Sequence, residues 1–275
     1  MTHIEALDLD RLPAHLMVMG GGYVGLELAQ AMRRFGSEVT VIERGPQLAS
    51  RENPDVGAAL FELFHDEGIE VLLGTDIRRV EGRSAEKIRV YVKDGHREHF
   101  VEGTDLLVAT GRPPNTDGIG LEQAGVELDE HGYVKVNERL ETTAANVWAM
   151  GDCAGSPQFT HAAYDDFRVV HDNLIGGNRT TKNRLVPFCM FTDPELARVG
   201  RNESEARRDG IESPGQDADG GCAPHQDGAR TARIPDYLCM RRSGGASSGQ
   251  LRWLAGAGAD MADRPSATGM SRIVR

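Results

Sequence analysis

The sequence has no long hydrophobic run. None of its stretches approaches the roughly 18 to 20 consecutive apolar residues that a membrane-spanning helix needs. Near the start, Glu5, Asp8 and Asp10 stand where a secretory signal would carry positive charge followed by an apolar run. We therefore expect a cytoplasmic protein with no membrane partner.

Cysteine is scarce, and basic residues are fewer than acidic ones. The 275 residues include four cysteines that form neither a C-x-x-C pair nor a recognisable metal spacing, so we expect neither a disulfide framework nor a metal site. The 42 acidic residues outnumber the 31 basic ones, which gives a formal charge of -11. Because binding to a nucleic-acid backbone is largely electrostatic, we expect no nucleic-acid partner.

The sequence does contain a repeated strand-and-helix pattern. Residues 15–19 are apolar, and residues 26–35 place apolar side chains at helical spacing before Gly36, a typical helix end. A second strand, a second helix and a third strand are predicted at 39–43, 56–67 and 69–73. Two consecutive strand-helix-strand units predict an α/β fold with a parallel sheet. Later strand signals are a hairpin at 88–92 and 99–101, an apolar strand at 105–109, a short ribbon near 133–136 and a buried strand at 147–150.

A glycine-rich turn lies between the first strand and the first helix. It reads Gly20-Gly21-Gly22-Tyr23-Val24-Gly25, a G-x-G-x-x-G spacing in the strand-turn-helix context that dinucleotide binding requires. The first glycine permits the tight turn, the second lets the backbone approach a pyrophosphate, and the third permits close packing of helix on strand. The turn therefore predicts a dinucleotide site, although glycine-rich turns of purely structural use are common.

An acidic residue follows at the distance expected for a ribose ligand. Glu43 lies at the end of the second predicted strand, 18 residues beyond Gly25. A carboxylate there accepts from a 2'-OH and repels a 2'-phosphate, so we expect NAD(H) to be preferred over NADP(H). Two alternatives remain open. Glu43 can be an ordinary solvated side chain, and the adjacent Arg44 is a residue type that accommodates a phosphate.

Three motifs in order along the chain indicate one family. Residues 16–44 read LMVMGGGYVGLELAQAMRRFGSEVTVIER, residues 109–115 read ATGRPPN, and residues 147–152 read VWAMGD. Together they resemble class I pyridine nucleotide-disulfide oxidoreductases such as dihydrolipoamide dehydrogenase, glutathione reductase and mercuric reductase. The resemblance covers roughly residues 12–211. It implies a Rossmann-like NAD-binding domain within a three-layer ββα-type FAD/NAD(P)-binding architecture.

The resemblance also implies roles for residues outside the glycine turn. It places Gly111 at the junction between the nucleotide domains. Tyr23, as a gate, and Glu27 match positions that face the nicotinamide and the flavin. For Tyr23 and Glu27, simple helix packing remains the alternative.

On the flavin side, the resemblance assigns Gly151 and Asp152 to the ribityl chain of FAD. His161 and Ala162 match the helix that runs beneath the flavin, expected at 158–173. Two structural alternatives stay open: Asp152 can cap the segment that follows it, and His161 can be a satisfied, partly buried histidine.

The same resemblance divides the chain into segments. We expect a linker remnant, an NAD-binding domain, the C-terminal part of an FAD-binding domain and the start of a truncated dimer-interface domain at 1–11, 12–111, 112–180 and 185–211. Intact relatives are homodimers, and whether this chain dimerises is left open.

Several family features are missing from this sequence. A separate FAD-binding G-x-G-x-x-G, the redox pair C-x-x-x-x-C and the C-terminal His-x-x-x-x-Glu pair are not found, so we expect an N-terminally truncated chain with an incomplete FAD domain and assign no catalytic residue. Residues 212–275 contain ten glycines, four prolines and no lysine, and we expect them to be disordered. A permitted back-translation of 215–228, read one base out, resembles the family's next interface segment. We therefore hypothesise a frameshift near 211–214 and an out-of-frame tail.

The resemblance implies an FAD-dependent NAD(P)H oxidoreductase. Hydride would pass from NADH to the flavin and electrons onward to a disulfide or a metal ion, as in dihydrolipoyl dehydrogenase or mercuric reductase. We expect this chain alone to be catalytically incomplete. The alternatives are a non-catalytic NAD(H)-binding fragment or gene remnant, and an NADH oxidase-like flavin reductase.

Overall fold

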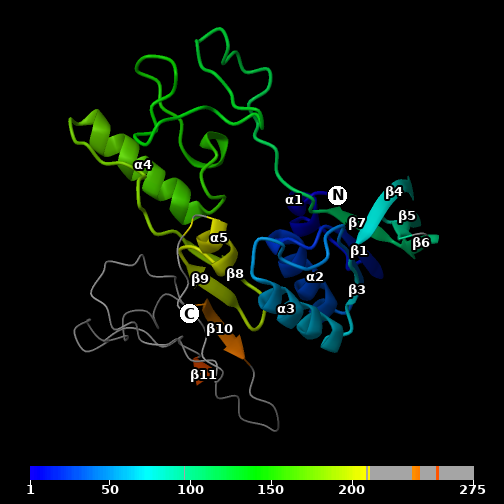
Figure 1. Cartoon of the computed structure of the whole chain (residues 1–275). Helices are drawn as coiled ribbons and strands as arrows, with labels where there is room; N and C mark the ends of the chain where they lie inside the picture. Colours follow the sequence, from blue (N-terminus) through cyan, green and yellow to red (C-terminus); the bar gives the residue numbers. More distant parts are fainter. Residues whose placement is uncertain (96, 209, 211–236, 242–251, 254–275) are drawn as a thin grey trace. The chain divides into compact units, whose positions relative to one another are not determined.

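The computed structural model describes residues 1–95, 97–208, 210, 237–241 and 252–253 (Figure 1). The chain divides into two compact units, Met1–Thr192 and Asp193–Arg275. None of the helices in these described ranges has both the length and the apolar character needed to cross a membrane.

The first unit contains a four-stranded parallel sheet with the strand order β3-β2-β1-β7. Helices connect β1 to β2 and β2 to β3, which confirms the two predicted strand-helix-strand units and the α/β fold. The bounds of these elements are β1 His15–Met19, α2 Tyr23–Phe35, β2 Glu38–Ile42, α3 Pro54–Asp66, β3 Glu70–Leu72 and β7 Asp105–Val108.

Strand β1 is buried on both faces, and its alternate residues face two different layers. The Val18 side chain lies 3.3 Å from the position of a Cβ built on Gly25, so Val18 packs against α2. Met17 instead belongs to a buried cluster that includes residues of the antiparallel strand β5 (Ile88–Asp94). The other buried members of this cluster are Ile42, Ile88, Val90, Val92 and Leu106. Helix, parallel sheet and antiparallel strands therefore stack as the three predicted layers.

The antiparallel layer has the order β4-β5-β6. Strands β5 and β6 (Arg97–Gly103) form the predicted hairpin, each longer than the alternation indicated. Strand β4 (Thr75–Gly82) was not predicted. Its two large apolar residues, Ile77 and Val80, are three positions apart and so show no alternation that would mark a strand, and only Thr75 in it is buried.

The first residues of the chain pack onto the parallel sheet. Sequence analysis treated 1–11 as a linker, whereas the structure has helix α1 at His3–Leu7. The Met1 ammonium donates to the Leu106 carbonyl at 2.7 Å, and the Val108 N–H donates to the Met1 carbonyl at 2.9 Å. Strand β7 is therefore bonded on one side by β1 and on the other by this segment.

A bidentate ion pair fixes the same segment to β7. The two guanidinium nitrogens of Arg11 donate to the two carboxylate oxygens of Asp105 at 3.0 and 2.6 Å. The Asp105 side chain is fully buried. Burial acts to raise the pKa of Asp105, but hydrogen bonds from Arg11 and Thr104, the Arg11 charge and the Ala85 N–H outweigh it, so the pKa is lowered below its ordinary value.

Residues 112–192 contain one long helix, α4 (Thr160–Leu174), which confirms the helix predicted at 158–173. A 3-10 helix η1 (Gly151–Ala154) and strand β8 (Pro187–Met190) flank it in sequence. The expected ribbon is reduced to isolated bridges, which are Leu128 to Val134 and Val136 to Thr142.

The prediction of a buried strand at 147–150 is wrong. Val147 is 38% exposed and Met150 is 47% exposed. Within the described part of the chain, this segment pairs through one isolated bridge, from Trp148 to Glu141. A strand is buried only when ladders of hydrogen bonds satisfy its backbone and neighbouring layers cover its side chains, and this segment has neither there.

The second unit contains β9 (Leu196–Val199), α5 (Glu203–Arg208), β10 (Tyr237–Arg241) and β11 (Arg252–Trp253). Strand β10 pairs antiparallel with both β9 and β11. Sequence analysis expected no strand after residue 212, because this stretch is rich in glycine and its sequence sustains no strand period. The rest of the predicted disordered tail and the hypothesised frameshift at 211–214 lie outside the described residues.

Candidate functional site

In the glycine turn between β1 and α2, the first and last positions, Gly20 and Gly25, leave no space for a side chain. Gly20 has φ +106°, and a Cβ on it would lie 2.6 Å from the Ala109 carbonyl oxygen. A Cβ on Gly25 would lie 2.3 Å from the Gly20 carbonyl oxygen. Gly20 therefore allows the turn to pass close to the end of β7, and Gly25 allows α2 to start directly against the turn.

The middle glycine of the motif has different surroundings. Gly22 is the N-cap of α2, is exposed, and would have no atom within 4 Å of an added Cβ. The N-terminus of α2 therefore opens onto unfilled space at Gly22, where backbone N–H groups and the helix dipole favour an anionic group. This is the arrangement that a pyrophosphate needs.

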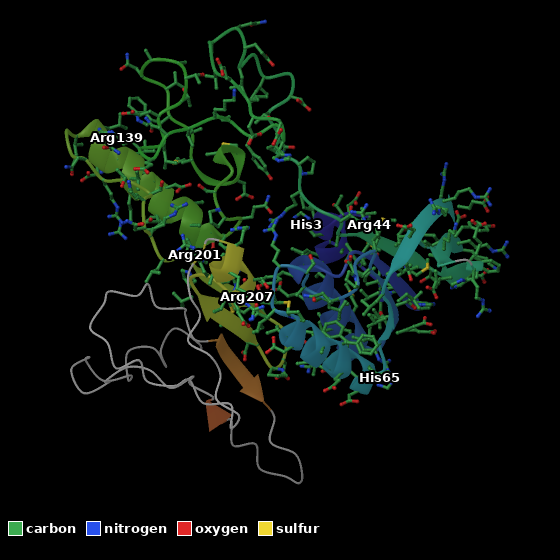
Figure 2. The ribbon with its side chains drawn as sticks, viewed as in Figure 1. His3, Arg44, His65, Arg139, Arg201 and Arg207 are labelled. Atoms are coloured by element: carbon green, nitrogen blue, oxygen red, sulfur yellow. The ribbon has the colours of Figure 1, made fainter. Side chains whose placement is uncertain are left out.

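Glu43 directly follows β2 and lies beside the same turn. Its two carboxylate oxygens accept from the Gly21 N–H and the Gly45 N–H, each at 2.6 Å. These bonds fix the carboxylate against the backbone at the carboxyl end of β2. Glu43 is therefore not an ordinary, freely solvated side chain. Arg44, labelled in Figure 2, is exposed.

The first turns of α2 carry three further residues singled out from the sequence. The Tyr23 hydroxyl donates to a carboxylate oxygen of Glu52 at 2.5 Å. A Glu27 carboxylate oxygen accepts from the Phe191 N–H at 2.7 Å. Val24 is half-buried. Sequence reasoning did not find Glu52, because no motif relates a residue in the loop after β2 to the start of α2.

The predicted flavin-contacting residues lie around η1 and the start of α4. Gly151 has φ +73°, and its N–H donates to a carboxylate oxygen of the buried Asp166 at 2.7 Å. Asp152 is exposed inside η1, whose N-cap is Met150, so Asp152 is not a helix cap. Its carboxylate is thus held at the surface by a turn that Asp166 fixes.

His161 is exposed but makes two contacts within the chain, so it is a satisfied histidine that is not buried. Its Nε2 lies 2.8 Å from the Pro187 carbonyl oxygen, and its ring stacks on Phe159 with ring centroids 5.1 Å apart. The adjacent Ala162 is buried. Gly111, with φ +142°, has no atom within 4 Å of an added Cβ.

Asp166 and Arg184 are structural residues that sequence reasoning missed. The Arg184 guanidinium donates to Asp166, whose side chain is fully buried, and lies 3.7 Å from Asp165. The sequence did contain a signal for this pair. Asp166 shares the buried face of α4 with Ala162 and Val169, and a buried aspartate requires a partner.

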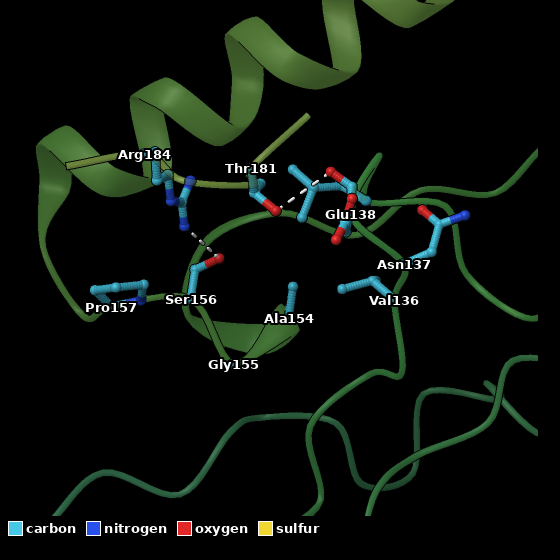
Figure 3. A pocket seen from close by; sticks show the side chains of 10 residues that line it. Val136, Asn137, Glu138, Ala154, Gly155, Ser156, Pro157, Thr181 and Arg184 are labelled. Atoms are coloured by element: carbon cyan, nitrogen blue, oxygen red, sulfur yellow. Dashed lines mark hydrogen bonds between the residues drawn. The ribbon is translucent and has the colours of Figure 1, made fainter. Parts of the chain in front are cut away.

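A cavity of about 310 Å³ lies next to this ion pair (Figure 3). Arg184 donates to the Ser156 hydroxyl at 3.3 Å, and the Thr181 hydroxyl donates to the Glu138 carbonyl oxygen at 3.2 Å. The Arg184 guanidinium that lines this cavity is thus already paired with Asp165 and Asp166. Gly151, Asp152 and His161 are not among its lining residues.

The parallel sheet, the glycine turn at the carboxyl end of β1 and the antiparallel layer define an α/β protein of the Rossmann type. The chain belongs to the pyridine nucleotide-disulphide oxidoreductase family, whose sequence model matches residues 1–166.

Among curated relatives, the chain is 39% identical over 208 residues to the probable pyridine nucleotide-disulfide oxidoreductase RclA of Escherichia coli, covering 75% of this chain and 46% of the relative. It is 40% identical over 212 residues to a mercuric reductase of Streptomyces lividans, covering 77% and 44%. The solved Cu(II) complex of the HOCl-induced flavoprotein disulfide reductase RclA from Escherichia coli superposes with a TM-score of 0.69 at 37% identity, covering 77% of this chain and 48% of that structure. The chain thus spans less than half the length of these relatives.

Proposed function

We propose that this chain binds NAD(H) at the glycine turn and Glu43, as part of an FAD-dependent oxidoreductase. The observation that carries the proposal is the position of the Glu43 carboxylate, which accepts from Gly21 and Gly45 beside the open N-terminus of α2. An anion-binding helix end and an adjacent carboxylate are the two elements that recognise a pyrophosphate and a ribose.

Each part of the site has a distinct task in this proposal. The N–H groups at the start of α2 would bind the pyrophosphate, and Gly22 would let it approach the backbone. The Glu43 carboxylate would accept from the adenosine ribose hydroxyls. When bound together, the nicotinamide supplies a hydride and the flavin accepts it, and the protein contributes binding and orientation.

For FAD the described residues offer part of a site. Asp152 presents a carboxylate at the surface, as a ribityl hydroxyl requires, and Gly151 is held against Asp166. A second pyrophosphate-binding glycine motif is not present in the sequence. We infer that this chain by itself completes the NAD(H) site and not the FAD site.

Replacing Glu43 with Ala is expected to narrow the preference for NADH over NADPH by about 1 to 2 kcal/mol, the scale of a hydrogen bond to a charged group. The parent carboxylate would be desolvated beside the 2'-phosphate of NADPH, and the alanine removes that repulsion. Isothermal titration of both variants with both nucleotides measures the change. Arg44→Ala, at the neighbouring position, is the matched control. If Arg44→Ala changed the preference for NADH over NADPH and Glu43→Ala did not, the assignment of Glu43 would be contradicted.

We expect the purified chain to be colourless and to reduce no acceptor at the expense of NADH. Its closest pair of cysteines is 17 positions apart, whereas the family relay uses a pair five positions apart in sequence. Oxidised flavin is yellow, so bound FAD is visible directly. NADH consumption is followed with lipoamide, glutathione disulfide and Hg(II), with FAD added. Turnover that disappears in a cysteine-free variant would overturn the view that this chain alone is catalytically incomplete.

A further inference from the structure

The first side chain of α2 is held by a buried carboxylate from another loop. The Tyr23 hydroxyl donates to Glu52 Oε1 at 2.5 Å, across 29 positions of sequence. Glu52 is 3% exposed, while Tyr23 is half-buried. Hydrogen bonds to a charged acceptor are stronger than neutral ones, so this contact restricts where the Tyr23 ring lies.

The loop that carries Glu52 is itself fixed to the glycine turn. The Ala49 N–H donates to the Gly21 carbonyl at 2.8 Å, and the Glu52 N–H donates to the Ala49 carbonyl at 2.7 Å. The Gln47 side chain donates to the Glu52 carbonyl at 3.0 Å, and Leu48 is fully buried. Glu52 therefore has a set position relative to the turn at which Tyr23 begins α2.

The strand order shows to which side Tyr23 is held. The connection after β1 leads to β2, while β7 pairs on the other side of β1, so the crevice at the carboxyl ends of the strands lies between β1 and β7. The loop bearing Glu52 follows β2 and Glu43, on the opposite side of β1. A dinucleotide with its ribose on Glu43 would extend its other half toward the crevice.

We propose that Glu52 is a positioning residue that holds Tyr23 on the β2 side and keeps the β1–β7 crevice open for the nicotinamide half of NAD(H). This rests on the proposed NAD(H) site. In the absence of the Glu52 carboxylate, the Tyr23 ring is released and competes for the crevice. The adenosine half, bound by Glu43 and the start of α2, is unaffected.

The test compares NADH with ADP-ribose, which lacks the nicotinamide. In the full chain, Glu52→Ala is expected to weaken NADH binding about three- to tenfold and to change ADP-ribose binding by less than about twofold. Tyr23→Phe should have the same effect, since it also removes the hydrogen bond. Glu52→Gln keeps an acceptor oxygen and should recover most of the NADH affinity. Equal weakening of both ligands, unchanged NADH binding, or tighter NADH binding would each overturn the proposal.

A measurement without nucleotide separates this role from the NAD(H) site itself. Urea unfolding of Tyr23→Phe, Glu52→Ala and the double variant forms a double-mutant cycle for the hydrogen bond. We expect the double variant to lose no more stability than Glu52→Ala alone, whereas additive losses would show that the two side chains do not interact. A parent chain that binds neither NADH nor ADP-ribose would overturn the proposed function, and this cycle would still report whether the contact exists.

Discussion

Gly25→Ala is expected to weaken NADH binding strongly and to lower the free energy of unfolding by about 3 kcal/mol. A Cβ at this position would lie 2.3 Å from the Gly20 carbonyl oxygen, a distance that backbone atoms cannot accept without moving. Either α2 or the Gly20 end of the turn must shift, and both would hold the pyrophosphate. We expect NADH affinity to fall by about a hundredfold or more, which corresponds to about 2.7 kcal/mol.

Gly22→Ala is the matched control for that clash. Gly22 has no atom within 4 Å of an added Cβ and a φ of -84°, which alanine adopts readily. We expect its urea midpoint to stay close to that of the parent, while NADH binding weakens because the methyl group enters the space a pyrophosphate needs. Normal stability with normal NADH binding in Gly22→Ala would contradict the location of the phosphate site. An unchanged free energy of unfolding in Gly25→Ala would contradict the close packing of Gly25 against the Gly20 carbonyl.

Asp105→Asn is expected to lower the free energy of unfolding at neutral pH by about 2 to 3 kcal/mol, the range for hydrogen bonds to charged groups. The substitution replaces one of the two acceptor oxygens of the Arg11 fork with an amide NH2, so the fully buried side chain can no longer accept both bonds. The loss is smaller than for an orphaned buried charge, because Arg11 is 37% exposed and can turn to solvent. Urea denaturation followed by circular dichroism measures it.

The pH dependence of this difference gives an independent check. The pKa of Asp105 is lower in the folded chain than its ordinary value of about 3.9, so folding favours the ionised form. Its contribution is therefore fully present above pH of about 4 and is lost as the pH falls through the folded-state pKa. The difference in the free energy of unfolding between the parent and Asp105→Asn should be constant from pH 7 to about 5 and should become smaller in stronger acid. A gap that widens in acid would contradict the assigned direction.

The parallel-sheet half of the fold could be predicted because its sequence signals are local and agree with one another. Helix α2 begins after a glycine turn, follows a helical period and ends at Gly36, whose φ of +112° is one that glycine adopts without strain. Strand β4 and helix α1 could not be predicted in the same way. β4 is an exposed edge strand without alternation, and α1 is five residues long and held by contacts with β7 that are about 100 positions away in sequence.

The candidate site divides along the same line. Glu43 was identified by its spacing from Gly25, since the topology of a strand-helix-strand unit fixes where the end of β2 lies. Glu52 and Asp166 were not identified, because each acts through one contact with a distant residue, Tyr23 and Arg184 respectively. The buried strand expected at 147–150 failed for a related reason, because strand burial depends on neighbouring strands that a local apolar run does not encode.

The most direct test of the central claim is to locate bound NADH on the full chain by amide NMR shifts. Titration into ¹⁵N-labelled protein should give its largest shifts at Gly21, Gly22 and Gly45, whose N–H groups lie at the turn or on the Glu43 carboxylate. Amides of 151–163 should shift little, since no NAD(H) contact is assigned there. Absence of binding, or shifts centred on 151–163 with the turn unchanged, would contradict the assignment of the NAD(H) site to the glycine turn and Glu43.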